Sequence, residues 1–346
     1  MLTKKQPLSA KIGEVKFRQK VIEQLKGKKV YFPHYLKSTE ISDYLKKKSA
    51  NSWLVFQKLK KEKIPLSPFL DIGAGQCART ALLTSRLNCR GFSLDISAES
   101  LQTAPIFCQK LELAKLPLRI CADATRLPFA DNSFPFVFTF ETLHHFPDPE
   151  PVVKEAYRVL APGGFFYIGE EPVKRLVHFS LWRRDGYHLR WWEKILKALV
   201  ILHFISAPGK SEVAAGILEE TFSLPTWEKA LDIFEEIKVE VIPFPFGPKS
   251  TITKRAGKNW LKPKLLTKLL VNFAGGGLNI LGRKKGKINQ GQKELTSLPV
   301  CPDCQRQLAK KDEFFICPVN HRYPIKNGIW YLLPERLMKK LYPNFK

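Results

Sequence analysis

The stretch "PFLDIGAG", residues 68–75, joins a short apolar run to an aspartate and two glycines. A helix-like segment, "QCARTALLTSRL", follows directly. Apolar strands that turn tightly through glycines into a helix are typical of α/β proteins, which bind ligands at the carboxyl ends of their strands. The stretch therefore predicts the first strand and the first ligand-binding turn of a parallel sheet.

The same alternation continues along the chain. Apolar runs in "CRGFSLDIS", "LRICADAT", "FPFVFTFET" and "GFFYIGEEP" are separated by helix-like segments, and "KVEVIPF" and "GLNILGRKK" are later candidate strands. Strands that are apolar on both faces lie in sheets covered by helices on both sides. We expect a doubly wound, mostly parallel α/β domain over residues 66–285, preceded by a basic helical extension over 1–65.

Asp95 ends the second predicted strand, 20 residues after Gly75. A carboxylate at this place can accept hydrogen bonds from both hydroxyls of a ribose. The glycine turn and this carboxylate together predict an adenosine-containing ligand, although a glycine pair alone is a weak signal.

The continuation "ADATRLPFADNSFPFVFTFETLHHFPDPEPVVKEAYRVLAPGGFFYI" is more specific. With the preceding motifs it resembles the class I S-adenosylmethionine-dependent methyltransferases, in particular the type 11 group, over about residues 66–172. The resemblance implies a seven-stranded Rossmann-like sheet with S-adenosylmethionine lying across the ends of its first three strands. It also implies a set of cofactor-binding positions: Asp71, Gly73, Gly75, Asp95, Asp123, Ala124, Glu141 and Thr142.

Each of these positions has an implied place. By this resemblance Asp71, Gly73 and Gly75 line the methionine and ribose end of the pocket, and Asp95 holds the ribose. Asp123 and Ala124 face the adenine. Glu141 and Thr142 close the pocket. Cys77 departs from the pattern, because the family often has a third glycine there. We expect looser packing of the following helix and weaker but intact cofactor binding.

Methyl transfer requires an aligned acceptor, exclusion of water and, for some acceptors, removal of a proton. Four side chains near the ends of the fourth and fifth predicted strands are candidates for orienting the acceptor or acting as a base: His144, His145, Glu170 and Glu171. We expect the two glutamates at the rim of the pocket. A packing or hydrogen-bonding role explains each histidine equally well.

The C-terminal region contains the pattern Cys301-x2-Cys304-x12-Cys317-x3-His321. Three thiolates and an imidazole at this spacing predict a closed, structural zinc site in a module over residues 295–335. Its pieces "CPDC", "ICPVNH" and "YPIKNGIWYLLP" are similar to zinc modules of rRNA guanine-N1 methyltransferases and of small methyltransferase activators. We expect loss of the zinc to spare cofactor binding.

Two segments interrupt the α/β pattern. Residues 173–222 form an aromatic and basic insertion that is apolar on every side from Ala198 to Ile205, and we expect a packed lid helix there in preference to an interfacial one. Residues 248–275 are a basic linker with a helix. No apolar run is long enough to cross a bilayer, no secretory signal is recognisable, and buried reduced cysteines are expected, so we expect a cytoplasmic protein that is able to contact membranes peripherally.

The net charge of +25 is concentrated in the flanking segments. Residues 1–65 carry 17 basic and 5 acidic side chains, and residues 248–293 carry 12 basic and none acidic. RNA and anionic membranes attract such charge equally well. The sequence favours a methyltransferase for a small, glycan or lipid-like acceptor slightly over an RNA methyltransferase. A non-catalytic binding protein with the same fold is the third hypothesis, and oligomeric state stays open.

Overall fold

The computed structural model describes residues 6–25, 38–176, 179–184, 189–244, 246–254, 259–288 and 294–345. Its strands are β1 (Phe69–Ile72), β2 (Gly91–Asp95), β3 (Leu118–Cys121), β4 (Phe134–Phe140), β5 (Leu160–Val173), β6 (Trp182–Arg183), β7 (Ser206–Ala207), β8 (Glu236–Pro243), β9 (Ser250–Thr253), β10 (Gly276–Arg283), β11 (Ala309–Lys311), β12 (Phe314–Ile316), β13 (Arg322–Lys326) and β14 (Ile329–Tyr331).

Its α-helices are α1 (Leu8–Leu25), α2 (Ser38–Lys61), α3 (Ala78–Arg86), α4 (Ala98–Gln102), α5 (Ala104–Lys110), α6 (Glu150–Val159), α7 (Trp191–Ala198), α8 (Leu202–Ile205), α9 (Lys210–Ala214), α10 (Leu224–Leu231), α11 (Leu265–Ala274) and α12 (Glu335–Leu341). Two short 3-10 helices, η1 (Leu143–His145) and η2 (Leu295–Ser297), complete the elements. None of the described helices is long and apolar enough to cross a membrane.

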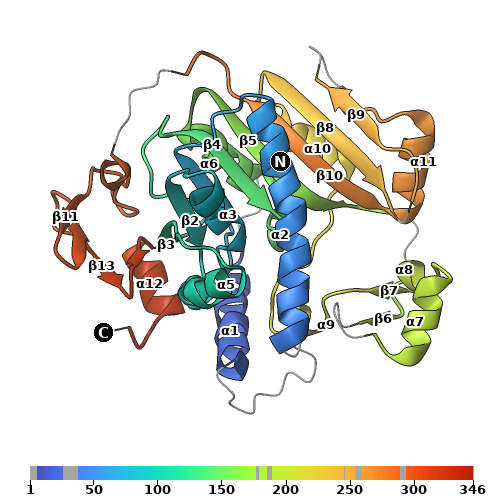
Figure 1. Ribbon diagram of the computed structural model, residues 1–346, viewed down its shortest axis with the longest axis horizontal. Coiled ribbons are helices and arrows are strands. Elements are labelled where there is room, and N and C mark those ends of the chain that lie inside the picture. The colour runs from blue at the N-terminus through green and yellow to red at the C-terminus, as the bar shows by residue number, and fades with distance from the viewer. Residues whose placement is uncertain are drawn as a thin grey trace.

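The central sheet has the strand order β3-β2-β1-β4-β5-β10-β8. The first five strands are parallel, whereas β10 runs antiparallel to both β5 and β8. The predicted mostly parallel, seven-stranded α/β fold is confirmed. The last candidate strand in the sequence, β10, inserts between β5 and β8, and β9 extends the sheet at that edge (Figure 1).

Both faces of this sheet are buried, because alternate side chains of β1 enter different clusters. Leu70 and Ile72 pack in the cluster that contains α6 and α10. Phe69 packs on the other face, with Phe56 of α2 and Leu83 of α3. Burial on both faces explains why these strands are continuous apolar runs in the sequence. All seven cysteines lie in the described ranges and none forms a disulfide.

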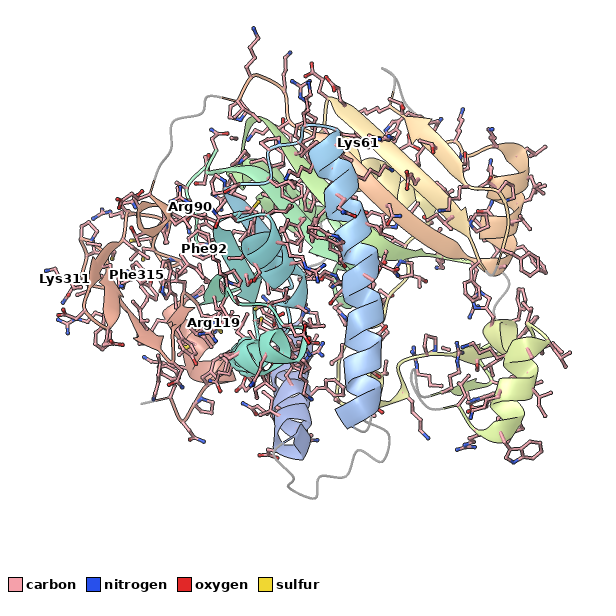
Figure 2. The ribbon with its side chains drawn as sticks, viewed as in Figure 1. Lys61, Arg90, Phe92, Arg119, Lys311 and Phe315 are labelled. Carbon is pink, nitrogen blue, oxygen red and sulfur yellow. The ribbon has the colours of Figure 1, made fainter. Side chains whose placement is uncertain are left out.

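The C-terminal module continues the central sheet. Strand β14 pairs in parallel with β3, and β13, β12 and β11 follow it outward in antiparallel order. The Trp330 ring bridges the two parts, with its centroid 5.6 Å from that of Phe92 and 4.6 Å from that of Phe315. Figure 2 labels Phe92 on the central sheet and Phe315 in the module. The hydrophobic core of the module is therefore continuous with that of the sheet.

The insertion after β5 is not a single packed helix. It forms β6, α7, α8, β7 and α9, and it projects beside α11 at the end of the molecule opposite the C-terminal module (Figure 1). Leu199 and Ile201 are exposed, so the expectation of a packed lid over Ala198–Ile205 is wrong for this part. The reason is that this stretch turns at Val200, which has a positive φ, instead of continuing as one helix.

Candidate functional site

The loops after β1 and β2 are joined by hydrogen bonds. The backbone N–H groups of Gly73 and Ala74 donate to the Leu94 carbonyl at 2.8 and 2.9 Å. The Asp95 carboxylate accepts from Gly75 N–H at 2.8 Å and from Ser97 N–H at 2.9 Å. Each carboxylate oxygen thus has one backbone donor that fixes its orientation, and each keeps a lone pair for a ligand hydroxyl.

Position 73 can hold only a glycine, because the backbone conformation and the neighbouring Thr142 side chain exclude a Cβ atom. Its φ is +76°, and an added Cβ would lie 2.3 Å from Cγ2 of Thr142. The loop after β1 therefore contacts the loop after β4 directly, which brings two of the predicted cofactor positions together. Gly75 has a φ of +52° and open space beside it, as expected for a backbone that a ligand approaches closely.

Cys77 adopts the left-handed conformation, with φ 60°, at the N-terminus of α3. A glycine would adopt this conformation with less strain. The thiol is nevertheless fully buried, and burial raises its pKa. The side chain thus packs in the cluster that contains Ala98 and Leu101 of α4, at the start of α3.

The rim at the ends of β1, β4 and β5 is acidic and is organised by Arg79. The guanidinium group contacts Glu141 at 2.9 Å and Glu170 at 3.7 Å and lies over the Phe140 ring. Burial raises the pKa of Asp71 to about 8, with Arg79 opposing and Asp95 adding to the shift. A bound cation would relieve this carboxylate repulsion, and S-adenosylmethionine carries a sulfonium and an ammonium group.

Helix α1 lies across the same edge. Lys11 forms an ion pair with Asp123, whose carboxylate also accepts from Thr125 N–H at 2.9 Å and Thr125 Oγ1 at 2.7 Å. Ala124, beside it, is buried. The predicted adenine-facing position is thus held by the N-terminal extension, a contact that no motif in the sequence indicates.

Glu14 of α1 contributes another carboxylate near Asp95. Burial raises its pKa, but Arg18, His145 and His144 outweigh burial and lower it overall. Its Oε2 atom is buried without a hydrogen-bond partner among the described residues. A buried, charged acceptor with one vacant oxygen suits a cationic or hydroxyl-bearing ligand. The donor and acceptor set of this edge therefore fits S-adenosylmethionine.

Glu171 does not lie at the pocket rim, because its side chain is fully buried. Its carboxylate accepts from the N–H groups of Thr142 (2.7 Å) and Leu143 (2.8 Å) through Oε1, and from His144 N–H (3.2 Å) through Oε2. The expected place of Glu171 is wrong: it caps η1 from within the core. Glu170 does lie at the partly exposed rim.

The Glu171 carboxylate also orients His144, whose Nδ1 lies 3.1 Å from Oε2. The Nε2 atom lies 4.0 Å from a carboxylate oxygen of Glu219, in the returning segment of the insertion. Burial would lower the pKa of His144, but the hydrogen bond and charge of Glu171 raise it overall. The ring is therefore held by a buried carboxylate with its second nitrogen facing the site.

His145 differs from His144 in its hydrogen-bond partner and in the direction of its pKa shift. Its Nδ1 lies 2.9 Å from the Leu218 carbonyl, and burial together with the adjacent His144 lowers its pKa. The two imidazoles and Glu219 form one group of ligand-type atoms within 4.8 Å of one another. Two neighbouring histidines with pKa values shifted in opposite directions are typical of a site that handles protons.

The C-terminal module and the helix that follows it contact the segments around Asp95. The Tyr342 hydroxyl, just after α12, donates to the Ile96 carbonyl at 2.8 Å and accepts from Ala98 N–H at 2.8 Å. Leu332 N–H donates to the Cys121 carbonyl at 2.9 Å, at the end of β3. The module is thus bonded to the segments on both sides of the predicted ribose position.

The four predicted metal ligands meet in the module. The Sγ atoms of Cys304 and Cys317 are 3.8 Å apart, and Nδ1 of His321 lies 3.4 Å from Sγ of both Cys301 and Cys317. In a tetrahedral zinc site with Zn–S of about 2.3 Å and Zn–N of about 2.1 Å, sulfurs lie about 3.8 Å apart and sulfur and nitrogen about 3.5 Å apart. The donor atoms are spaced as zinc requires.

The amino-acid sequence was compared with protein families and with known proteins. The model of a methyltransferase-domain family matches residues 70–168. Demethylmenaquinone methyltransferase of Bacillus mycoides is 31% identical over 189 residues, which cover 53% of this chain and 75% of that protein.

The chain belongs to the class I S-adenosylmethionine-dependent methyltransferases.

Other relatives of this methyltransferase differ in what their names state. The 27-O-demethylrifamycin SV methyltransferase of Amycolatopsis mediterranei is 28% identical over 50% of this chain and 64% of its own length. A sterol 24-C-methyltransferase of Schizosaccharomyces pombe is 31% identical over 31% of this chain and 28% of its own. The matches thus span less than two thirds of these two relatives.

Solved structures also resemble the methyltransferase. A geranyl diphosphate methyltransferase has a TM-score of 0.41 at 12% identity, covering 68% of this chain and 85% of that one. A complex of the Haloferax volcanii Trm112 methyltransferase activator with a methyltransferase has a TM-score of 0.38 at 17% identity, covering 73% and 100%. Both scores are low, so the fold assignment rests on the strand order and the family match.

Several side chains of the site have no signal in the sequence. Lys11, Glu14, Glu219 and Tyr342 lie far from the motifs and come from the N-terminal helix, the insertion and the end of the chain, whereas Arg79 follows the glycine turn in α3 without a pattern that marks it. Their common feature is that tertiary packing alone brings them to the ends of the parallel strands.

Replacing Asp95 with asparagine tests the ribose position. Burial raises the pKa of Asp95 to about 6, against the hydrogen bonds of Ser97 and Gly75 that lower it. If the charged carboxylate binds the ribose, affinity for S-adenosylmethionine is constant above about pH 7 and falls as the pH drops through 6. We expect Asp95→Asn to weaken binding by about tenfold or more at pH 8, corresponding to 1.5–3 kcal/mol, and to flatten this pH dependence. Calorimetric titration measures both, and unchanged affinity would exclude the placement.

Proposed function

We propose that the protein transfers the methyl group of S-adenosylmethionine to a small, glycan or lipid-like acceptor. The observation that carries the proposal is the meeting of two elements at one edge of the sheet: the Asp95 carboxylate, held by Gly75 and Ser97, and the Glu171–His144 pair. Glu14 of α1 interacts electrostatically with both. Bound cofactor supplies an electrophilic methyl carbon, so no covalent protein nucleophile is needed.

The chain's own residues then have three tasks. Asp71, Asp95 and Glu14 match the positive charges of the cofactor. Helix α1 and the returning part of the insertion exclude water, because Gly13 packs so closely on residue 215 that an added Cβ would lie 2.8 Å from the Ala215 carbonyl oxygen. His144 accepts a proton from the acceptor through Nε2, with Glu171 as its positioning residue.

We also assign a structural zinc ion to Cys301, Cys304, Cys317 and His321. Three thiolates and one imidazole at tetrahedral spacing leave no open position for a substrate. Burial raises the pKa of Cys317, but the N–H groups of His321 and Val319 and the neighbouring thiols outweigh it and lower the pKa to about 7. Tyr342 makes the module a support for the loop that binds the ribose.

An RNA acceptor is the second candidate, because the flanking segments are strongly basic. The insertion favours the first candidate: Leu218 and Glu219 contact the two histidines, so the insertion narrows the entrance beside the base. A flipped nucleotide on a large RNA needs more open access than a small acceptor.

One experiment separates these functions. The protein is purified with what it retains from the cell, and the bound material is divided into lipid and RNA fractions. Each fraction is then offered with methyl-labelled S-adenosylmethionine. We expect label in the lipid or small-molecule fraction. Label in RNA supports the second candidate, and absence of cofactor binding in calorimetry would leave a non-catalytic binding protein.

A further inference from the structure

Exposed apolar side chains are concentrated in one region of the molecule. In the described part of the chain, 13 of 18 exposed large apolar residues lie within residues 176–201 or 244–273. Isolated surface leucines are ordinary, but a contiguous patch marks an interaction site. The concentration of exposed apolar side chains in this region therefore indicates a surface that binds another molecule.

Two helices supply the centre of the patch. Trp191, Ile195 and Leu199 follow one another at intervals of four along α7 and its end, and all three are exposed, Trp191 to 75%. Residues four apart share one face of a helix. Leu265, Leu269 and Phe273 repeat this pattern along α11, and Leu265 is 73% exposed. We call the outward faces of these six residues the α7–α11 surface.

Helix α11 is apolar on two sides for two different reasons. Val271 and Ala274 are buried where the helix packs on β8. The stripe of Leu265, Leu269 and Phe273 points the other way, out of the protein. Packing against the sheet thus accounts for one face only, and the second apolar face stays largely exposed although Phe273 contacts the Phe204 ring.

Contacts near α8 join the insertion to α11 and to the loop after β8. Leu176 N–H donates to the Asn272 carbonyl at 2.6 Å, and the rings of Phe204 and Phe273 lie 5.4 Å apart. The rings of His203 and Phe244 lie 4.1 Å apart. Figure 1 shows α8 below the end of α11, with α7 beyond it on the same side of the molecule.

Positively charged side chains surround the α7–α11 surface in the described part of the chain. Lys194 and Lys197 are exposed on α7, and Lys264 and Lys268 are exposed at α11. Within the described parts of residues 176–210 and 244–273, the only acidic side chain is Glu193. It is buried and accepts from Trp182 Nε1 at 2.9 Å and from Arg190 N–H at 2.8 Å. Among the described residues of these two segments, the exposed charge is therefore positive.

We infer that the α7–α11 surface docks on an anionic lipid bilayer, with Trp191, Leu265 and their neighbours entering the interface and the lysines contacting lipid phosphates. Amphipathic helices with an aromatic and leucine face beside lysines bind such interfaces. A second copy of the chain is a poorer occupant, because it would bring identical positive charges together. RNA is a poorer occupant because phosphates do not cover apolar stripes.

Docking would place the active-site entrance near the lipid. The insertion leaves β5 at Val173 and returns at Phe222, where Lys174 N–H donates to the Phe222 carbonyl at 2.9 Å. Its returning segment holds Glu219 beside His144. If the proposed function also holds, the acceptor is reached from the bilayer. Docking itself does not depend on methyl transfer, and it is measured without cofactor or acceptor.

The test uses the full-length protein and sedimentation with vesicles. We expect binding to phosphatidylcholine vesicles that contain about 30 mol% phosphatidylglycerol, at least about tenfold tighter than to phosphatidylcholine alone, and weaker binding at high salt. Trp191→Ser combined with Leu269→Ser should reduce this binding by about tenfold or more. Leu54→Ser combined with Ile106→Ser is the matched control, since both side chains are exposed elsewhere, and it should bind as the original protein does.

The lysines are tested separately. Lys264→Glu combined with Lys268→Glu should remove most of the preference for anionic vesicles, whereas the same change at the exposed Lys60 and Lys61 of α2 should have a smaller effect. Calorimetric binding of S-adenosylmethionine verifies that every variant is folded.

Three outcomes would overturn the inference. One is equal binding to neutral and anionic vesicles. Another is vesicle binding that the Trp191 and Leu269 changes leave intact, which would mean that basic charge alone attracts polyanions, RNA included. The third is a dimer that these changes dissociate without an effect on vesicle binding, which would assign the surface to a second copy.

Discussion

The double variant Cys301→Ser, Cys304→Ser is expected to lose its zinc and, with it, the fold of strands β11 to β13. Zinc binding by such ligand sets is coupled to folding and is worth about 10–16 kcal/mol. The core of the module is small, and its buried residues Phe315 and Tyr323 lie next to the ligands. Metal analysis of the purified protein measures the loss. Cys89→Ser, a cysteine outside the module, is the control that should keep its zinc.

The same variant should bind S-adenosylmethionine about three- to tenfold more weakly, since one or two hydrogen bonds of about 0.5–1.5 kcal/mol each support the ribose loop through Tyr342. This expectation differs from the one drawn from the sequence, in which zinc loss spares cofactor binding. Tyr342→Phe separates the two effects: it should keep its zinc and show a similar loss of affinity. Zinc loss with unchanged affinity would mean that the module does not position the loop.

The second large effect is expected at His144. His144→Ala should lower kcat by about 10²- to 10⁴-fold if this side chain takes the proton of the acceptor. Affinity for S-adenosylmethionine should change little, because the ring points to the acceptor side. Steady-state rates and calorimetry measure the two quantities. His145→Gln is the comparison, and a smaller loss is expected because its Nδ1 is already engaged by the Leu218 carbonyl.

The dependence of the rate on pH tests whether His144 acts as the base. A base must be neutral to accept a proton, and Glu171 raises the pKa of His144. The rate should therefore fall as the pH drops through a value above the ordinary pKa of histidine. Glu171→Gln removes the charge, so the fall should move to lower pH, with a lower thermal stability because the cap of η1 is weakened. A profile that stays in place in Glu171→Gln would exclude this pairing.

The motifs after the parallel strands were predictable because their chemistry is local. A glycine turn after β1 and an aspartate at the end of β2 must meet at one edge whenever the strands are parallel, so the places of Gly73, Gly75 and Asp95 followed from their order in the chain. The meeting of Cys301, Cys304, Cys317 and His321 was predictable for a similar reason: pairs of residues a few positions apart need only one turn and one hairpin to converge.

Other features depend on contacts between segments distant in sequence. Glu171 was expected at the rim, but the direction of a side chain at the end of β5 is decided by the pleat and by the loop after β4 that it caps. The same applies to Lys11, Glu14 and Tyr342, which reach the site from the two ends of the chain.

The sequence by itself thus determined the family and the mostly parallel α/β class, and it predicted which four side chains could bind a metal, since periodicity and short spacings encode these features. Only the tertiary structure decided that the C-terminal module extends the sheet at β3, that Glu171 supports His144 from the core, and that α7 and α11 each leave an apolar face exposed. Such features arise from long-range packing, because a side chain's burial depends on which distant segment covers it and not on its neighbours in the chain.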